Sequence, residues 1–343
     1  MPEGHTVHRL ARTLTELFAT QRLQVSSPQG RFAAGALLLD GATFLRAEAW
    51  GKQLFGAFSR TSPEPEQWLR VHLGLYGAWT FDGDAGTDVV HAIGAPRRRI
   101  GERDSVPDRG GPPATAGEWS PPAPRGAVRV RLVGDHAVAD LTGPTACEVL
   151  TTAEKTAVEA RLGPDPIRPD GGCSSLEVAR ERFVTRVRRS RVAVGQQLMD
   201  QAVVAGVGNI YRAEVLFRAG IDPLRPGRDV PGAALAALWD DLVVLMRDGA
   251  ATGRIVTTRP EHRDAAHEVV SGDAGDRTTG RAATGAARRR TRQNTDDDPD
   301  AVPAADAFYA YHRDGLPCRV CGTPVLVGEL AGRTLFSCGR CQR

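Results

Sequence analysis

Four cysteines near the end of the chain constrain its fold more than any other feature. Cys318 and Cys321 form one C-x2-C pair, and Cys338 and Cys341 form a second pair after 16 intervening residues. Each pair can turn two thiolates toward one point, and four thiolates complete the tetrahedral shell of a structural Zn²⁺. Residues 325–327 and 334–336 are strand-like, and glycines between them favour a turn. The sequence therefore predicts a β-hairpin that carries one Zn²⁺. We expect no nucleotide cofactor.

The length and charge of the chain narrow its class. A chain of 343 residues suggests two or three domains. No apolar run approaches the ~18 residues of a membrane span and no signal-peptide pattern opens the chain, so we expect a cytoplasmic protein with no membrane partner. Lys and Arg outnumber Asp and Glu by only 44 to 41, so a nucleic-acid surface requires a local concentration of arginine. Cys147 and Cys173 lie outside the two pairs and are interpreted as free thiols.

The chain begins Met1-Pro2-Glu3-Gly4, which can supply a nucleophile. If Met1 is removed, Pro2 carries a free secondary amine, and an α-amino group has a reference pKa of about 8. Such an amine can attack an electrophilic carbon, and Glu3 can act as general acid or base. The alternative is an ordinary first helical turn, because both residues are common there.

The middle of the chain reads as helices around a glycine-rich turn. Residues 174–189 have apolar side chains at helical spacing, with Ser174 and Glu177 as a capping box. A short helix is expected over residues 194–201, then a turn over 205–208, then a helix from Asn209, which we expect to be its N-cap. This arrangement can offer N–H groups and the Asn209 amide to a phosphate, although a simple corner between two helices remains the alternative.

These features together resemble the formamidopyrimidine-DNA glycosylase/endonuclease VIII family. Residues 198–217 resemble its helix–two-turn–helix, Trp50-Gly51-Lys52 resembles its lysine motif, and residues 72–77 resemble the loop that carries its intercalating residues. The proline start and the four-cysteine hairpin occur in the family's order. Residues 5–8 favour the endonuclease VIII branch of the family, and within that branch the chain most resembles an actinobacterial endonuclease VIII of the second type.

The resemblance implies a multidomain α+β fold. Residues 1–150 are expected to hold an N-terminal helix and an antiparallel β-sandwich, with residues 82–126 as a long loop. Residues 151–258 would form the helical DNA-binding domain, residues 259–307 a disordered linker and residues 308–343 the zinc hairpin. Strands are expected near residues 22–26, 43–50, 53–59, 68–81 and 128–132.

The resemblance also implies an activity, that of a bifunctional DNA glycosylase and abasic-site lyase of base excision repair. Pro2 would attack C1′ of the damaged nucleotide and Glu3 would supply a proton. Lys52 would contact the lesion phosphate, and Asn209 and Arg333 would hold the phosphates around the flipped nucleotide, with Arg333 also assisting δ-elimination. The partner is damaged DNA, and we expect a bacterial, nucleoid-associated monomer.

Leu75 and Tyr76 are the candidates for the wedge that fills the gap left by a flipped base. A buried core pair is the alternative for these two residues. Gly74 and Thr6 depart from the family, which more often has a polar residue and a glutamate there. Oxidised pyrimidines are the expected lesions, and oxidised purines or a non-catalytic binder of damaged DNA stay open as alternatives.

Overall fold

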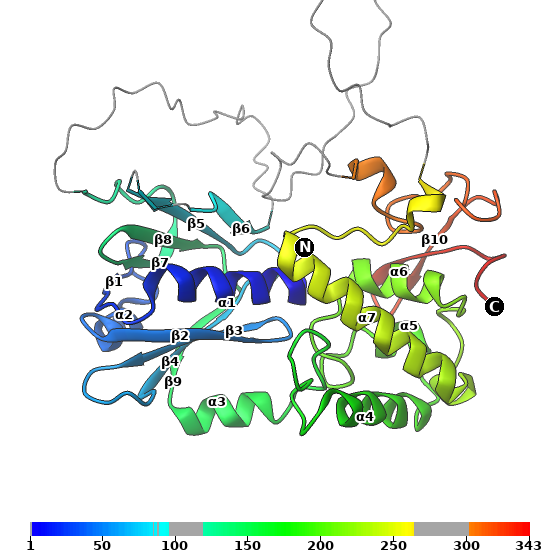
Figure 1. Ribbon diagram of the computed structural model, residues 1–343, viewed down its shortest axis with the longest axis horizontal. Coiled ribbons are helices and arrows are strands. Elements are labelled where there is room, and N and C mark those ends of the chain that lie inside the picture. Colours follow the sequence, from blue (N-terminus) through cyan, green and yellow to red (C-terminus); the bar gives the residue numbers. More distant parts are fainter. Residues whose placement is uncertain (1, 85, 88, 96–118, 264–301) are drawn as a thin grey trace, which may run out of the picture.

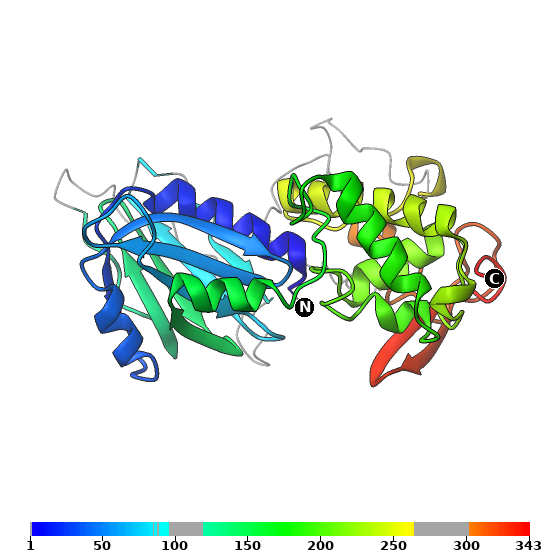
Figure 2. The same ribbon diagram turned by 90° about the horizontal axis from the view of Figure 1, so that it is seen from below.

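The computed structural model describes residues 2–84, 86–87, 89–95, 119–263 and 302–343. They form two lobes, a β-sandwich with its N-terminal helix and a helical lobe that carries the C-terminal hairpin (Figures 1 and 2). The N-terminus lies between the two lobes in Figure 2. The start of the chain is therefore placed where both lobes can contribute side chains.

The sandwich lobe is built on helix α1 (Gly4–Phe18) and two antiparallel sheets. One sheet has the order β1-β7-β8-β5-β6 and the other β2-β3-β4-β9. The strands are β1 (Gln24–Ser26), β2 (Thr43–Trp50), β3 (Gln53–Ser59), β4 (Gln67–His72), β5 (Ala78–Gly83), β6 (Ala92–Gly94), β7 (Val128–Val133), β8 (Ala137–Thr142) and β9 (Ala146–Leu150), and α2 covers Ala33–Leu39. The apolar stripe of α1, with Leu10, Leu14 and Phe18 buried, packs into the core that both sheets share.

The strand expected over residues 68–81 is wrong, because this segment forms two strands in different sheets. β4 belongs to the four-stranded sheet and β5 to the five-stranded one. Gly74 has a positive φ of 66°, and the N–H of Gly77 donates to the Leu73 carbonyl at 2.9 Å, so the chain turns sharply between the strands. The expected loop over residues 82–126 also contains strand β6, which pairs with β5.

Helix α3 (Thr152–Glu159) packs on the sandwich lobe, where Val158 shares a buried cluster with Phe55 and Trp68. The helical lobe contains α4 (Leu176–Arg188), α5 (Val194–Gln197), α6 (Asn209–Arg218), the short 3₁₀ helix η1 (Gly227–Asp229) and α7 (Gly232–Thr252). Leu235, Leu238, Leu242 and Leu245 lie on the buried side of α7, and Gly253 ends this helix at φ 76°. Two predicted caps are wrong. Ser175 caps α4 and Gly208 precedes α6, because Asn209 is already helical.

The C-terminal hairpin consists of β10 (Leu326–Leu330) and β11 (Arg333–Ser337). It packs on α6, where Phe217 and Phe336 share a buried cluster with two of the four cysteines. Glu214 of α6 is fully buried and accepts N–H donors from Tyr309, Ala310 and Tyr311 at 2.7 to 2.8 Å. The hairpin is therefore fixed to the helical lobe.

The expected linker of residues 259–307 falls largely on 264–301, outside the described residues. Its described ends form short 3₁₀ helices, η2 (Pro260–His262) and η4 (Ala304–Asp306). Among the helices that the structure describes, none has the length and apolarity to cross a bilayer.

Candidate active site

The carboxylate of Glu3 lies at the N-terminus of α6, where the two lobes meet. It is fully buried and accepts hydrogen bonds from the N–H groups of Gly208 and Ile210 at 2.8 Å and of Tyr211 at 3.4 Å. The first N–H groups of a helix have no intrahelical acceptor, and they carry a partial positive charge that favours an anion. Glu3 therefore anchors the start of the chain to the helical lobe.

Burial shifts the pKa of the acid and of the neighbouring amine toward their neutral forms. Desolvation raises the pKa of Glu3, and the charge of Lys52 and the three N–H donors oppose this rise only in part. Desolvation lowers the pKa of Lys52, with the charge of Glu3 opposing and that of Arg333 adding to the effect. A carboxyl group with a raised pKa and an amine with a lowered pKa are suited to exchanging protons with a bound reactant.

Glycines allow three segments to meet around Glu3. A Cβ on Gly208 would lie 2.7 Å from Cγ and Oε1 of Glu3, so only glycine fits beside the carboxylate. The N–H of Gly4 donates to the Gly206 carbonyl at 2.8 Å. Gly51, at φ 57° in the turn between β2 and β3, approaches Ala205, because its Cβ would lie 2.8 Å from that side chain. The N-terminus, the Lys52 turn and the turn before α6 are thus in direct contact.

Asp165 supports this junction and was not among the residues predicted from the sequence. Its buried carboxylate accepts from His8 Nε2 and the Gly51 N–H, both at 2.7 Å, and from the Ile167 N–H at 2.8 Å. It joins α1, the Lys52 turn and the helical lobe. A lone aspartate in a proline-rich loop carries no motif, so the sequence offers no signal for this role. Trp50 adds a second connection between the same segments, because its Nε1 donates a hydrogen bond to the Gly163 carbonyl at 2.9 Å.

The other predicted polar residues lie near the same place. Pro2 is buried directly before Glu3. Arg333 is exposed at the first position of β11, and its charge lowers the pKa of Lys52 and of Arg212. Asn209 lies beside the hairpin, where its Nδ2 donates to the Thr334 carbonyl at 3.0 Å. The structure thus brings Glu3, Lys52 and Arg333 into one electrostatic cluster, with Asn209 at its edge.

Arg212 is a further residue that the sequence analysis missed. Its side chain is fully buried, and its Nη2 donates to Asn209 Oδ1 and, at 2.6 Å, to the Thr334 carbonyl. Burial lowers the pKa of Arg212 to about 10. Its Nε and Nη1 have no hydrogen-bond partner within the described part of the chain. Because Arg212 occurs one helical turn after Asn209, its spacing alone could have indicated a shared face.

The four cysteines of the hairpin are gathered as predicted. Their sulfur atoms all lie within 4.8 Å of one another, with Cys318 and Cys341 at 3.8 Å and Cys321 and Cys338 at 3.5 Å. Tetrahedral Zn²⁺ with Zn–S bonds of about 2.3 Å would place its sulfurs about 3.8 Å apart. The arrangement fits a metal ion of that size.

Leu75 and Tyr76 lie on the turn between β4 and β5. Tyr76 is 80% exposed and Leu75 is 45% exposed, so the alternative of a buried core pair is wrong. Gly74 cannot carry a side chain, because a Cβ there would overlap the hydroxyl of Thr145. The structure therefore gives a steric reason for the departure from the family at this position.

Comparison with known proteins agrees with this arrangement. The formamidopyrimidine-DNA glycosylase N-terminal domain matches residues 1–123, and the H2TH domain of the same glycosylase matches residues 162–260. Endonuclease 8 1 of Mycobacterium tuberculosis strain H37Rv is 38% identical over 348 aligned positions, which cover all of both chains. The chain belongs to the formamidopyrimidine-DNA glycosylase/endonuclease VIII family. The assignment to a second type of actinobacterial endonuclease VIII stays a prediction.

Other members of the family are more distant. The formamidopyrimidine-DNA glycosylase of Parasynechococcus marenigrum is 27% identical over all of this chain and 99% of its own. Among solved structures, MutM (Fpg) of Thermus thermophilus aligns with a TM-score of 0.63 at 23% identity, over 99% of this chain and 98% of that one. Lactococcus lactis Fpg with abasic-site DNA aligns at 0.64 and 17% identity, over 99% of each chain. These structures share the overall fold of this chain.

Proposed function

We propose that this chain is a bifunctional DNA glycosylase and abasic-site lyase of base excision repair that acts on oxidised pyrimidines. Membership of the family supports the two activities. The observation that supports the residue roles is the buried Glu3 carboxylate beside Lys52 and Arg333, one residue after Pro2. The endonuclease VIII likeness of residues 5–8 supports the lesion class.

The reaction begins once Met1 has been removed. The Pro2 amine attacks C1′ of the damaged nucleotide, the N-glycosidic bond breaks, and its electron pair leaves with the base. Glu3 supplies the proton that the departing base or the sugar oxygen needs, which its raised pKa favours. Opening of the sugar gives an iminium between Pro2 and C1′. Loss of a C2′ proton then expels the 3′ phosphate, and a second elimination can expel the 5′ phosphate.

The remaining residues hold the DNA. Lys52 contacts the lesion phosphate, and Asn209 and Arg333 hold the neighbouring phosphates. Leu75 and Tyr76 enter the gap in the base stack, for which their exposure at a turn is suited. One Zn²⁺ bound by the four cysteines would supply no chemistry to the reaction and would fix the hairpin that presents Arg333. We propose a cytoplasmic, nucleoid-associated monomer.

Borohydride trapping tests this function. Protein confirmed by intact mass to begin at Pro2 is incubated with duplexes that carry thymine glycol, 8-oxoguanine or an abasic site. We expect a reduced covalent adduct with the thymine glycol and abasic duplexes, and strand cleavage without borohydride. The matched control carries an N-terminal extension that turns the Pro2 amine into an amide and leaves every side chain in place. Binding without adduct or cleavage by the unextended protein would support a non-catalytic binder instead, and a preference for 8-oxoguanine would support a purine enzyme.

A further inference from the structure

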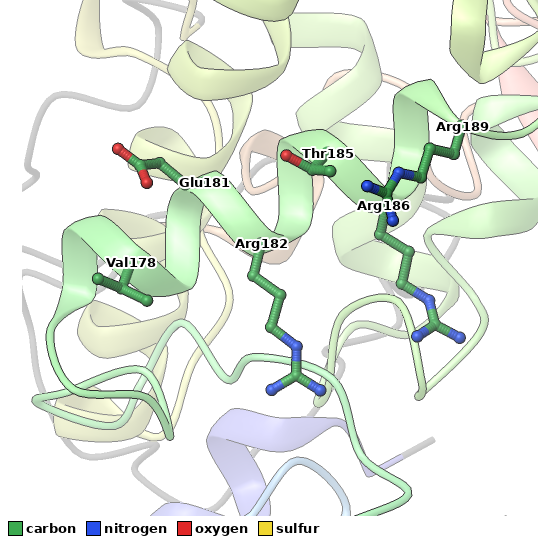
Figure 3. Close-up of a pocket in the computed structure, with 6 residues that line it drawn as sticks. All are labelled: Val178, Glu181, Arg182, Thr185, Arg186 and Arg189. Atoms are coloured by element: carbon green, nitrogen blue, oxygen red, sulfur yellow. The ribbon is translucent and has the colours of Figure 1, made fainter.

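Helix α4 presents an arginine-rich face that the catalytic proposal does not use. Ala179, Phe183 and Val187 form its inner face and are fully buried. The outer face lines a surface hollow of about 610 Å³ (Figure 3), formed by Val178, Glu181, Arg182, Thr185, Arg186 and Arg189. In Figure 3 the guanidinium groups of Arg182 and Arg186 extend away from the helix on the same side. We call Arg182, Arg186 and Arg189 the α4 arginine face.

The charge of this face is not balanced by neighbouring acids. Six arginines occur between positions 180 and 191, against the single acid Glu181. Arg180 pairs with Asp240 at 3.1 Å. Within the residues that the structure describes, the side chains of Arg186 and Arg189 form no ion pair or hydrogen bond, and both residues line the hollow. Like charges gathered on one face repel one another, so the fold gains nothing from this concentration. An anionic partner would compensate it.

The α4 arginine face continues toward the hairpin that carries Arg333. The chain passes from α4 into α5, and a Cβ on Gly195 would lie 3.2 Å from Cδ2 of Leu330. Leu330 ends β10 and pairs directly with Arg333 across the hairpin. The segment that follows α4 therefore contacts the hairpin proposed to hold the lesion strand. Seven residues separate Arg182 from Arg189, which is about 10 Å along a helix, or about three phosphates of one DNA strand.

We propose that the α4 arginine face binds the phosphate backbone of duplex DNA that flanks the lesion. This inference rests on the proposed function, because it assumes that the hairpin holds DNA. The contacts are independent of base sequence and extend the footprint beyond the nucleotides around the flipped base. Each phosphate neutralised by an arginine releases a counterion, so its contribution is read from the salt dependence of binding.

The test compares two double variants of equal charge. Arg186→Gln/Arg189→Gln removes two arginines of the α4 arginine face, and Arg31→Gln/Arg125→Gln removes two exposed arginines of the sandwich lobe. The Kd for a 30-bp duplex with a central tetrahydrofuran abasic analogue is measured from 50 to 200 mM NaCl. Loss of two phosphate contacts should make the slope of log K against log salt concentration less steep by about 1.8. Between 50 and 200 mM NaCl, the Kd of the wild type should therefore increase by a factor about 12 times larger than the Kd of the α4 variant. The control variant should keep the wild-type slope.

Equal slopes for the wild type and the α4 variant would overturn the inference, and an acidic protein would then be the better candidate partner. Equal losses in both variants would also overturn it, because the effect would follow net charge and not the face. A failure of the proposed function would show differently, as a wild-type protein that cleaves no damaged duplex. Circular dichroism and metal content of both variants establish that they are folded.

Discussion

Replacing Gly208 by alanine tests how closely the position of Glu3 controls the reaction. A Cβ on Gly208 would lie 2.7 Å from Cγ and Oε1 of Glu3, whereas an unstrained contact needs about 3.4 Å. The carboxyl group must therefore move by roughly 0.7 Å or more. The backbone at Gly208 has φ −126° and ψ −160°, which alanine adopts without strain, so the perturbation is steric.

The expected cost follows from that displacement. A misplacement of about 1 Å in a catalytic site can reduce the rate about 100-fold. Overpacking of this kind also costs about 1 to 3 kcal/mol of stability, which leaves most of the chain folded. We expect single-turnover excision of thymine glycol by Gly208→Ala to fall about 100-fold, with unchanged metal content.

Gly328→Ala is the matched control for this variant. It makes the same chemical change in strand β10 at a position where a Cβ meets nothing within 4 Å. Its excision rate should equal that of the wild type. A wild-type rate for Gly208→Ala would refute the reasoning, because Glu3 could then move without consequence for the reaction.

Four further outcomes are expected. Asp165→Asn leaves one buried N–H donor between the two lobes without an acceptor, so the free energy of unfolding of this variant in urea should fall by about 3 kcal/mol at pH 7. An unchanged free energy of unfolding would contradict the role of Asp165 in holding the lobes together. Burial lowers the pKa of His5 from 6.5 to about 3, so below pH 6.5 the unfolded chain binds a proton that the folded chain does not. The free energy of unfolding should therefore fall by about 2 kcal/mol between pH 6.5 and pH 5, and His5→Gln should remove this loss. Cys338→Ser should abolish binding of one Zn²⁺, measured by metal analysis, together with cleavage at abasic sites. Tyr76→Ala should leave the melting temperature unchanged, because the ring is 80% exposed, and should weaken binding of abasic duplex about tenfold by loss of stacking.

The sequence predicted best those elements that depend on local pattern. The bounds of β2 and β3 follow from the strand pattern, and the cysteine cluster follows from the spacing of the two C-x2-C pairs. The corner between β4 and β5 lies within residues 72–77, where the resemblance indicated a loop, whereas the strand pattern of residues 68–81 favoured a single strand. The break depends on Gly74 and Gly77, whose close contacts involve Thr145 and Leu73.

The sequence predicted the site residues that belong to motifs, and it did not predict the buried residues that connect the segments around the site. Glu3, Lys52 and Arg333 stand in recognisable motifs, although 330 residues separate the first from the last. Asp165 and Glu214 act through buried hydrogen bonds to backbone groups far away in sequence. Such bonds leave no periodic or spacing signal, so only the fold reveals them. The N-cap of α6 was wrong for the same reason, since the Asn209 side chain donates a hydrogen bond to the hairpin and does not cap the helix.

The central claim concerns which amine forms the covalent bond to the sugar. Lys52 is the natural competitor, because its pKa is lowered and it lies in the same charge cluster as Glu3. Peptide mapping by mass spectrometry after borohydride trapping on abasic DNA distinguishes the two amines after trypsin digestion. We expect the sugar remnant on the peptide of residues 2–9, at the nitrogen of Pro2. A remnant on the peptide that contains Lys52, with residues 2–9 unmodified, would contradict the central claim.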